Sequence, residues 1–257
     1  MSHHLVAGAI SAALLSINPA PVMAASDVVT GTQVEAAIVQ ISKDAYPVLS
    51  SMQDVSPLTS KLMGIVDKKI PAAKASEALD KGIDSFLSIP DEKVSAFATV
   101  VQSAYTGVSG DSCQSLGGSA ATSQQFASLP VVQGLDATKV KALQDKFAPA
   151  NKAVPSSSGG GDICLPASSQ GLEQIWVGQT ELTLNIPKAE SKAFVASLSK
   201  ALSVVPTPEW LKLLPDAKKS IVGNVDAKMA TKLEKSGKTL EKAFQADDRI
   251  QKRLSSS

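Results

Sequence analysis

The stretch TQVEAAIVQISKDAYPVLSSM, residues 32–52, decides the fold class that the sequence predicts. Thr32 and Glu35 have the spacing of a capping box, in which a hydroxyl accepts from the first free amides of a helix and a carboxylate reaches back. Pro47 is expected to kink or end this helix, because proline lacks an amide donor. Apolar residues recur four and three positions apart, as on the side of a helix that packs along another helix: Val34, Ile38, Ile41, Ala45, Val48 and Met52.

Three further amphipathic helices are predicted before residue 107, and prolines separate them. The first begins at Ser56 and Pro57, an N-cap followed by proline at the first helical position, and ends at Pro71. The second precedes Pro90, and the third ends where Gly107 can cap it. Four such helices with short connections indicate an up-and-down bundle. Their expected buried faces are Leu58, Leu62, Ile65, Val66 and Ile70; Ala75, Leu79, Ile83, Phe86 and Leu87; and Val94, Phe97, Val101 and Ala104.

Both cysteines of the chain lie in the middle of the sequence, and a disulfide between them is predicted. Cys113 and Cys164 each stand among Gly, Ser and Asp residues, which are typical of turns. Little regular structure is expected over residues 107–135, and a short helix is predicted between Asp136 and Pro149. The disulfide is therefore expected to hold an acidic first half to a basic second half.

The second half is also predicted to be mostly helical. Residues 172–186 are predicted to be helical first and extended afterwards, because their last apolar residues alternate with polar ones. A helix from about Lys188 follows, then a short amphipathic turn around Trp210 and a short helix over residues 216–222. The last long helix begins near Asp226 and carries a dense face of lysines: Lys228, Lys232, Lys235, Lys238 and Lys242.

The fold that we predict is mainly α: a helical bundle with an irregular disulfide-linked middle segment. Aromatic residues make up only 4% of the chain, so the core is expected to consist of aliphatic side chains, which suit helix packing. The predicted organisation is a cleavable signal or lumen-targeting segment, a four-helix N-terminal part, a Gly/Ser-rich disulfide-linked segment and a basic helical C-terminal part, the last three forming one domain: residues 1–24, 25–107, 108–166 and 167–257.

Charge indicates which part of the chain would meet a partner. The formal net charge of +1 argues against a nucleic-acid partner, because general binders need many Lys and Arg side chains to displace counterions from phosphate. Residues 1–112 carry seven Lys and Arg against eleven Asp and Glu, whereas residues 188–257 carry fourteen against eight. Docking onto an acidic partner is therefore expected at the C-terminal part.

The N-terminus has the features of a targeting segment. Residues 5–17 form an apolar run that is shorter than the roughly 20 residues of a membrane span but typical of a signal peptide. Cleavage is predicted after Ala24; an uncleaved anchor or a buried helix is the alternative. Because no Lys or Arg precedes Leu5, the segment resembles the thylakoid-transfer part of a bipartite plastid signal. That resemblance implies the thylakoid lumen, with the bacterial periplasm or secretion as alternatives, and disulfides form in all three.

Several kinds of chemistry are not expected of this chain. Histidine occurs only at His3 and His4, inside the predicted targeting segment, so the mature chain would have no His-based nucleophile system or zinc site. Residues 236–239 (SGKT) imitate the end of a phosphate-binding loop, but Lys232 stands where that motif needs glycine. We therefore expect a protein that is not an enzyme and has no cofactor and no metal ion.

The expected function is that of a non-catalytic soluble exported protein, an accessory or assembly factor that binds a photosynthetic membrane complex. A lumenal extrinsic photosystem subunit resembles it in these general features. The expected contacts with the partner protein are the lysine face of the last helix and Trp210, with peripheral membrane contact allowed. The alternative is a carrier of a small apolar ligand or lipid, which requires a cavity lined by residues such as Trp176 and Phe194.

Overall fold

A computed structural model describes residues 32–51, 56–110, 113, 129–155, 164–213, 215 and 225–248. Over these ranges the predicted mainly α fold is confirmed, with ten helices and no strand. The predicted targeting segment and the helix predicted over residues 216–222 lie outside the described residues. The helices are α2 (Gln33–Ser50), α3 (Ser56–Lys69), α4 (Ala72–Leu87), α5 (Asp91–Ala104), α7 (Pro130–Gln133), α8 (Ala137–Ala153), α9 (Ser169–Leu184), α10 (Lys188–Leu202), α11 (Thr207–Leu211) and α13 (Ala227–Ala246).

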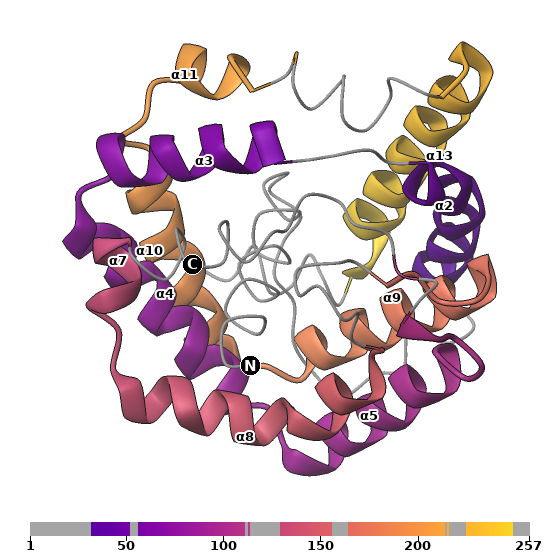
Figure 1. Ribbon diagram of the computed structural model, residues 1–257, viewed down its shortest axis with the longest axis horizontal. Coiled ribbons are helices and arrows are strands. Elements are labelled where there is room, and N and C mark those ends of the chain that lie inside the picture. The colour runs from indigo at the N-terminus through magenta and orange to yellow at the C-terminus, as the bar shows by residue number, and fades with distance from the viewer. Residues whose placement is uncertain are drawn as a thin grey trace.

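The helices pack as a curved array in which neighbours in space come from distant parts of the chain. α13 packs on α2, α2 on α9, α9 on α5, α5 on α8, α8 on α4, and α4 on α10 and α7. Figure 1 shows α4, α7, α10 and α11 on one side and α2, α9 and α13 on the other, joined by α8 and α5 along one edge. The expectation that the first four helices form an up-and-down bundle of their own is therefore wrong. Their apolar faces are buried against helices of the second half.

Polar side chains fix the predicted starts of three helices. The Thr32 hydroxyl accepts from the Glu35 amide at 3.2 Å. Asp136 accepts from the amides of the second and third residues after it at the start of α8. Asp226 accepts from the Met229 amide at 2.7 Å at the start of α13. These caps satisfy amides that have no partner within the helix, so local sequence predicts each start well.

Two prolines that were expected to limit helices lie inside them instead. α2 continues past Pro47 to Ser50, and α8 continues past Pro149 to Ala153. In both cases the residue after the proline is buried in the core: Val48 at 2% and Ala150 at 5% exposure. Each proline removes one hydrogen bond near a helix end, and burial of the following turn offsets that loss.

Residues 172–186 are not extended at their end: α9 is helical through Leu184. Leu182 packs with Ile186 in one buried cluster, whereas Leu184 packs in another. Since α9 lies between α2 and α5, it buries two faces, and their residues interleave in the sequence like the alternation of a strand. The short helix α7, which starts with Pro130, was also missed within the range expected to be irregular.

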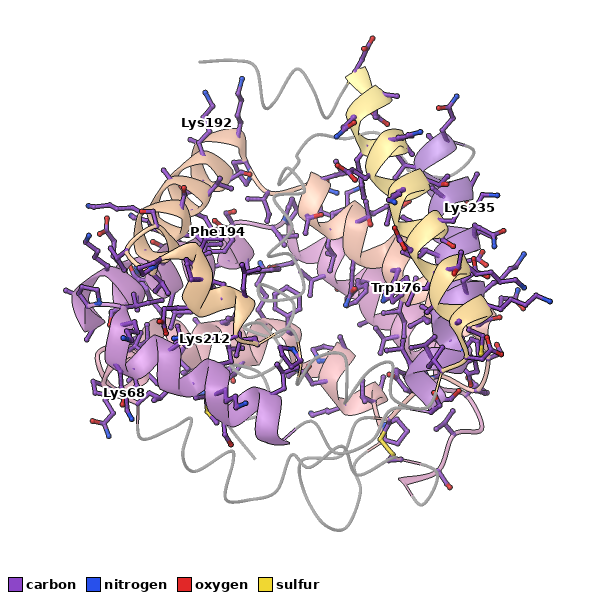
Figure 2. The ribbon with its side chains drawn as sticks, turned by 90° about the horizontal axis from the view of Figure 1, so that it is seen from above. Lys68, Trp176, Lys192, Phe194, Lys212 and Lys235 are labelled. Carbon is purple, nitrogen blue, oxygen red and sulfur yellow. A yellow bond between two sulfur atoms is a disulfide. The ribbon has the colours of Figure 1, made fainter. Side chains whose placement is uncertain are left out.

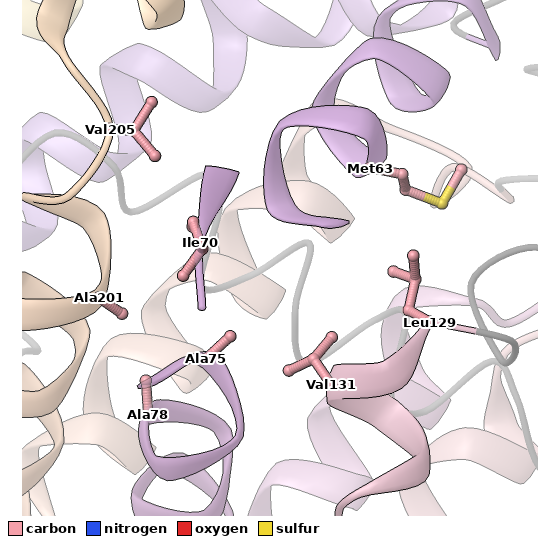
Figure 3. Packing of buried hydrophobic residues seen from close by; sticks show 8 residues of the cluster. All are labelled: Met63, Ile70, Ala75, Ala78, Leu129, Val131, Ala201 and Val205. Carbon is pink, nitrogen blue, oxygen red and sulfur yellow. The ribbon is translucent and has the colours of Figure 1, made fainter. Parts of the chain in front are cut away.

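The largest buried cluster joins helices from both halves (Figure 3). It lies where the end of α3, the start of α4, α7 and the end of α10 meet. Its members are aliphatic, as the low aromatic content predicts, so packing of small side chains draws these helices together. They are Met63, Ile70, Ala75, Ala78, Leu129, Val131, Ala201 and Val205.

Candidate functional site

The helix that carries the predicted lysine face, α13, lies at the edge of the array. Its apolar side faces inward: Ala243 is buried with residues of α2 and α9, and Leu240 and Phe244 pack against the same cluster. All five lysines of the face are exposed. Packing on one side therefore fixes which side of α13 is open to a partner.

A partly buried hydrogen bond fixes the position of α13 against α2. Ser236 is 3% exposed, and its hydroxyl donates to the carboxylate of Asp44. Gln40 donates to the same carboxylate at 2.8 Å. The pKa of Asp44 is lowered, first by the hydrogen bond from Ser236 and then by that from Gln40 and the positive charge of Lys232. Lys232 thus lies close enough to Asp44 for its positive charge to act on that carboxylate.

A second lysine of the face is paired within α13. Lys238 Nζ lies 2.5 Å from Glu234 Oε1, and both side chains are 67% exposed. The hydrogen bond between them raises the pKa of Lys238 and lowers that of Glu234. Glu234 and Lys238 are four residues apart in the favourable order, and their pairing offsets the charge of this lysine locally.

The other three lysines form the candidate site. Lys228, Lys235 and Lys242, hereafter the lysine stripe, recur every seven residues, so they lie along one side of α13 about 10.5 Å apart. They form no ion pair with any residue that the structure describes. Figure 2 shows Lys235 on the opposite side of the molecule from three other exposed lysines: Lys68, Lys192 and Lys212. These three lysines of the predicted face therefore have no described acidic partner, whereas Lys238 is paired with Glu234 and Lys232 lies near Asp44.

Trp210, the other predicted contact residue, does not join the stripe. It lies in α11, across the molecule from α13 in Figure 1, and its half-buried ring packs against the largest core cluster. Beside it, Leu211 is 53% exposed. The structure therefore gives Trp210 a packing role and leaves the lysine stripe as a separate surface.

Trp176 and Phe194, which the carrier hypothesis requires in one cavity, lie apart (Figure 2). Trp176 packs against the cluster between α2, α9 and α13. Phe194 of α10 covers Gly82 of α4, where a Cβ would lie 3.1 Å from its ring. Trp176 and Phe194 therefore pack between different helices, and the two rings do not line a common site.

The predicted disulfide between Cys113 and Cys164 is present, across 51 residues of sequence. Cys113 follows α5 and Cys164 precedes α9, and these two helices pack on each other. Both tyrosines of the chain hold the segment after the bond: Tyr105 donates to the Cys164 carbonyl at 2.7 Å, and Tyr46 to the Pro166 carbonyl at 2.8 Å. Burial raises the pKa of Tyr105 to about 12. The bond therefore joins the end of one half to the start of the other.

The remaining features that the sequence singled out give no reactive site. Residues 236–239 lie inside α13, where helical hydrogen bonds occupy the amides that a phosphate loop would offer. Within the described ranges, no three His, Cys, Asp or Glu side chains gather to hold a metal ion. No helix in that part of the chain is long and apolar enough to cross a membrane. Neither the protein-family models nor the curated protein sequences contain a match to this chain.

Sequence reasoning missed the contacts that separate the five lysines into two groups. The pair within α13 is visible in the sequence because its members are four residues apart. The contact between Ser236 and Asp44 spans 192 residues. Its only signal in the sequence is that Ser236 stands at the helical spacing of the apolar face, between Leu233 and Leu240.

Proposed function

We propose that this protein is a non-catalytic exported accessory or assembly factor, and that the lysine stripe docks it onto an acidic face of a membrane protein complex. The observation that carries this proposal is the set of three exposed lysines at two-turn intervals, without a described acidic partner, on a helix whose other side is packed. Such an arrangement favours attraction to an acidic surface over a role in holding this fold together.

The free energy expected from ion pairs of the lysine stripe shows that the salt dependence of docking should be measured. An exposed ion pair contributes about 0.2–1 kcal/mol, so three of them contribute roughly 0.6–3 kcal/mol. Complementary charge acts more strongly on the association rate and on the choice of partner than on affinity. Docking through the lysine stripe is therefore expected to weaken steeply as salt is added.

The compartment is part of the same proposal. The disulfide is compatible with an oxidising space, and the N-terminal resemblance favours the thylakoid lumen over the periplasm or secretion. Localising a tagged precursor and sequencing the N-terminus of the mature protein tests this directly. A chain that stays in a reducing compartment would contradict export, and a mature chain that keeps residues 5–17 would contradict cleavage after Ala24.

The docking surface is tested by reversing the charge of the stripe. Lys228→Glu, Lys235→Glu and Lys242→Glu together should abolish co-sedimentation with isolated photosynthetic membranes at about 20 mM salt, where screening is weak. The matched control reverses three exposed lysines elsewhere, which gives the same change in net charge: Lys68, Lys93 and Lys152. Circular dichroism checks that both variants remain folded.

The outcome separates docking by the stripe from attraction by overall charge. Loss of binding in the stripe variant alone supports the proposal. Equal loss in both variants would show that net charge suffices, and unchanged co-sedimentation of the stripe variant would exclude the stripe as the docking surface.

A further inference from the structure

From the geometry of α13 we infer that the partner element recognised by the lysine stripe is an acidic α-helix lying alongside α13. This inference rests on the proposed docking function, because it names the partner of that same surface. It follows from the rigidity of the stripe, from its spacing and from the chemistry of the residues around it.

The three lysines are anchored on a backbone that is held along its whole length. Asp226 caps the start of α13, Ser236 binds Asp44 of α2 near its middle, and Ala243 is buried near its end. The spacing between Lys228, Lys235 and Lys242 is therefore fixed by one straight helix. A partner whose carboxylates recur at the same interval can therefore pair with all three lysines at once with the least ordering of their flexible side chains.

The spacing fits a helix better than a strand. Seven residues of α-helix rise about 10.5 Å, so carboxylates at seven-residue intervals on a partner helix match the lysines at every repeat. Side chains on one face of a β-strand recur at multiples of about 6.6 Å, so their first two spacings, about 6.6 Å and 13 Å, do not coincide with the 10.5 Å spacing of the lysines. To meet all three lysines, the two helices must run nearly parallel or antiparallel, as in the packing class near 20°.

The surroundings of the stripe disfavour insertion into a lipid surface. Thr231 and Thr239 flank the lysines, and their hydroxyls donate to backbone carbonyls of α13 itself. The apolar side of α13 is already occupied by core packing. Among the described residues, the large exposed apolar side chains are Val195 and Leu211, on other helices. Interfacial membrane helices need an open apolar face as well as charge, so a protein helix is the better fit.

Two model peptides test the inference. Both are alanine-rich helices of about 21 residues with three glutamates. In one peptide the glutamates stand seven residues apart and share one side; in the other they stand five apart and spread around the helix. Fluorescence anisotropy at low salt measures binding of each peptide to the intact protein, with phosphatidylserine-containing vesicles as the lipid probe.

We expect the seven-residue peptide to bind at least about fivefold more tightly than its isomer, and the preference to vanish in the stripe variant but not in the control variant. Equal binding of the two peptides, or no binding of either, would overturn the inference. Tighter binding to the vesicles than to either peptide would also overturn it and would identify lipid as the ligand.

The membrane experiment distinguishes this failure from failure of the proposed function. If the stripe variant loses co-sedimentation while the peptides show no preference, docking by the stripe stands and the acidic helix is wrong. If co-sedimentation is unchanged in that variant, the proposed function fails, and the inference fails with it.

Discussion

Replacing Cys113 and Cys164 together by alanine is expected to remove about 4 kcal/mol from the free energy of unfolding. The bond closes a loop of 51 residues, and the chain-entropy relation assigns such a loop about 14 cal/mol/K, or about 4 kcal/mol at room temperature. Stability is lost because the unfolded chain has a higher conformational entropy when the bond is absent. Alanine is the appropriate replacement because Cys164 is buried, and a serine hydroxyl there would need a partner.

Urea unfolding followed by circular dichroism measures this loss. With a slope of roughly 2–3 kcal/mol/M, the midpoint should fall by about 1.5–2 M. Either single replacement should have nearly the same effect as the double one, since each already breaks the bond. Wild-type protein unfolded with reductant should match the double variant. A loss below about 1 kcal/mol, or additive losses in the single variants, would refute the reasoning.

Three further substitutions test the packing and the polar contact of individual helices. Gly178→Ala should destabilise the protein by about 1–3 kcal/mol, because the new methyl group would meet a phenylalanine ring of α5 at 2.9 Å. In the control variant Gly237→Ala the new methyl group meets nothing within 4 Å, and the substitution should stabilise α13 by about 0.5–1 kcal/mol. If thermal unfolding shows that Gly178→Ala and Gly237→Ala lower the stability equally, the close contact of α9 with α5 is contradicted. Ser236→Ala should cost about 1 kcal/mol and return the pKa of Asp44 toward its ordinary 3.8. Because the pKa of Asp44 is lowered in the folded state, its carboxylate stabilises the fold above pH 3.8, and this contribution is lost as the pH falls through the lowered pKa. An Asp44 titration that NMR finds unchanged in Ser236→Ala would contradict the role of the Ser236 hydrogen bond.

Much of the fold follows from local patterns. The starts of α2, α8 and α13 are predictable because Thr32, Asp136 and Asp226 each provide a side-chain acceptor for amides two or three residues ahead. Apolar residues at helical spacing predict which sides are buried. The disulfide is predictable because the chain has two cysteines, both in turn contexts.

The rest depends on contacts between distant residues. The sequence predicts a helix end at Pro149 and a kink or an end at Pro47, because the burial that holds the following turns comes from other helices. The end of α9 has the alternating pattern of a strand because α2 and α5 each bury one face of this helix, so that buried residues of the two faces alternate in the sequence. For the candidate site, the exposure of the lysines is predictable from the helix pattern. Which of them lie near an acid of another helix is not predictable, because Asp44 comes close to Lys232 only after α2 and α13 have packed.

The interleaved packing also has a consequence for how the chain acquires its structure. The main partners of α2 are α9 and α13, and those of α4 are α8 and α10, so the early helices find their neighbours only when much later segments have been made. Contacts that span so much sequence slow folding and leave apolar faces exposed in incomplete chains. We therefore expect the polypeptide to leave the ribosome largely unstructured and to fold cooperatively after synthesis is complete.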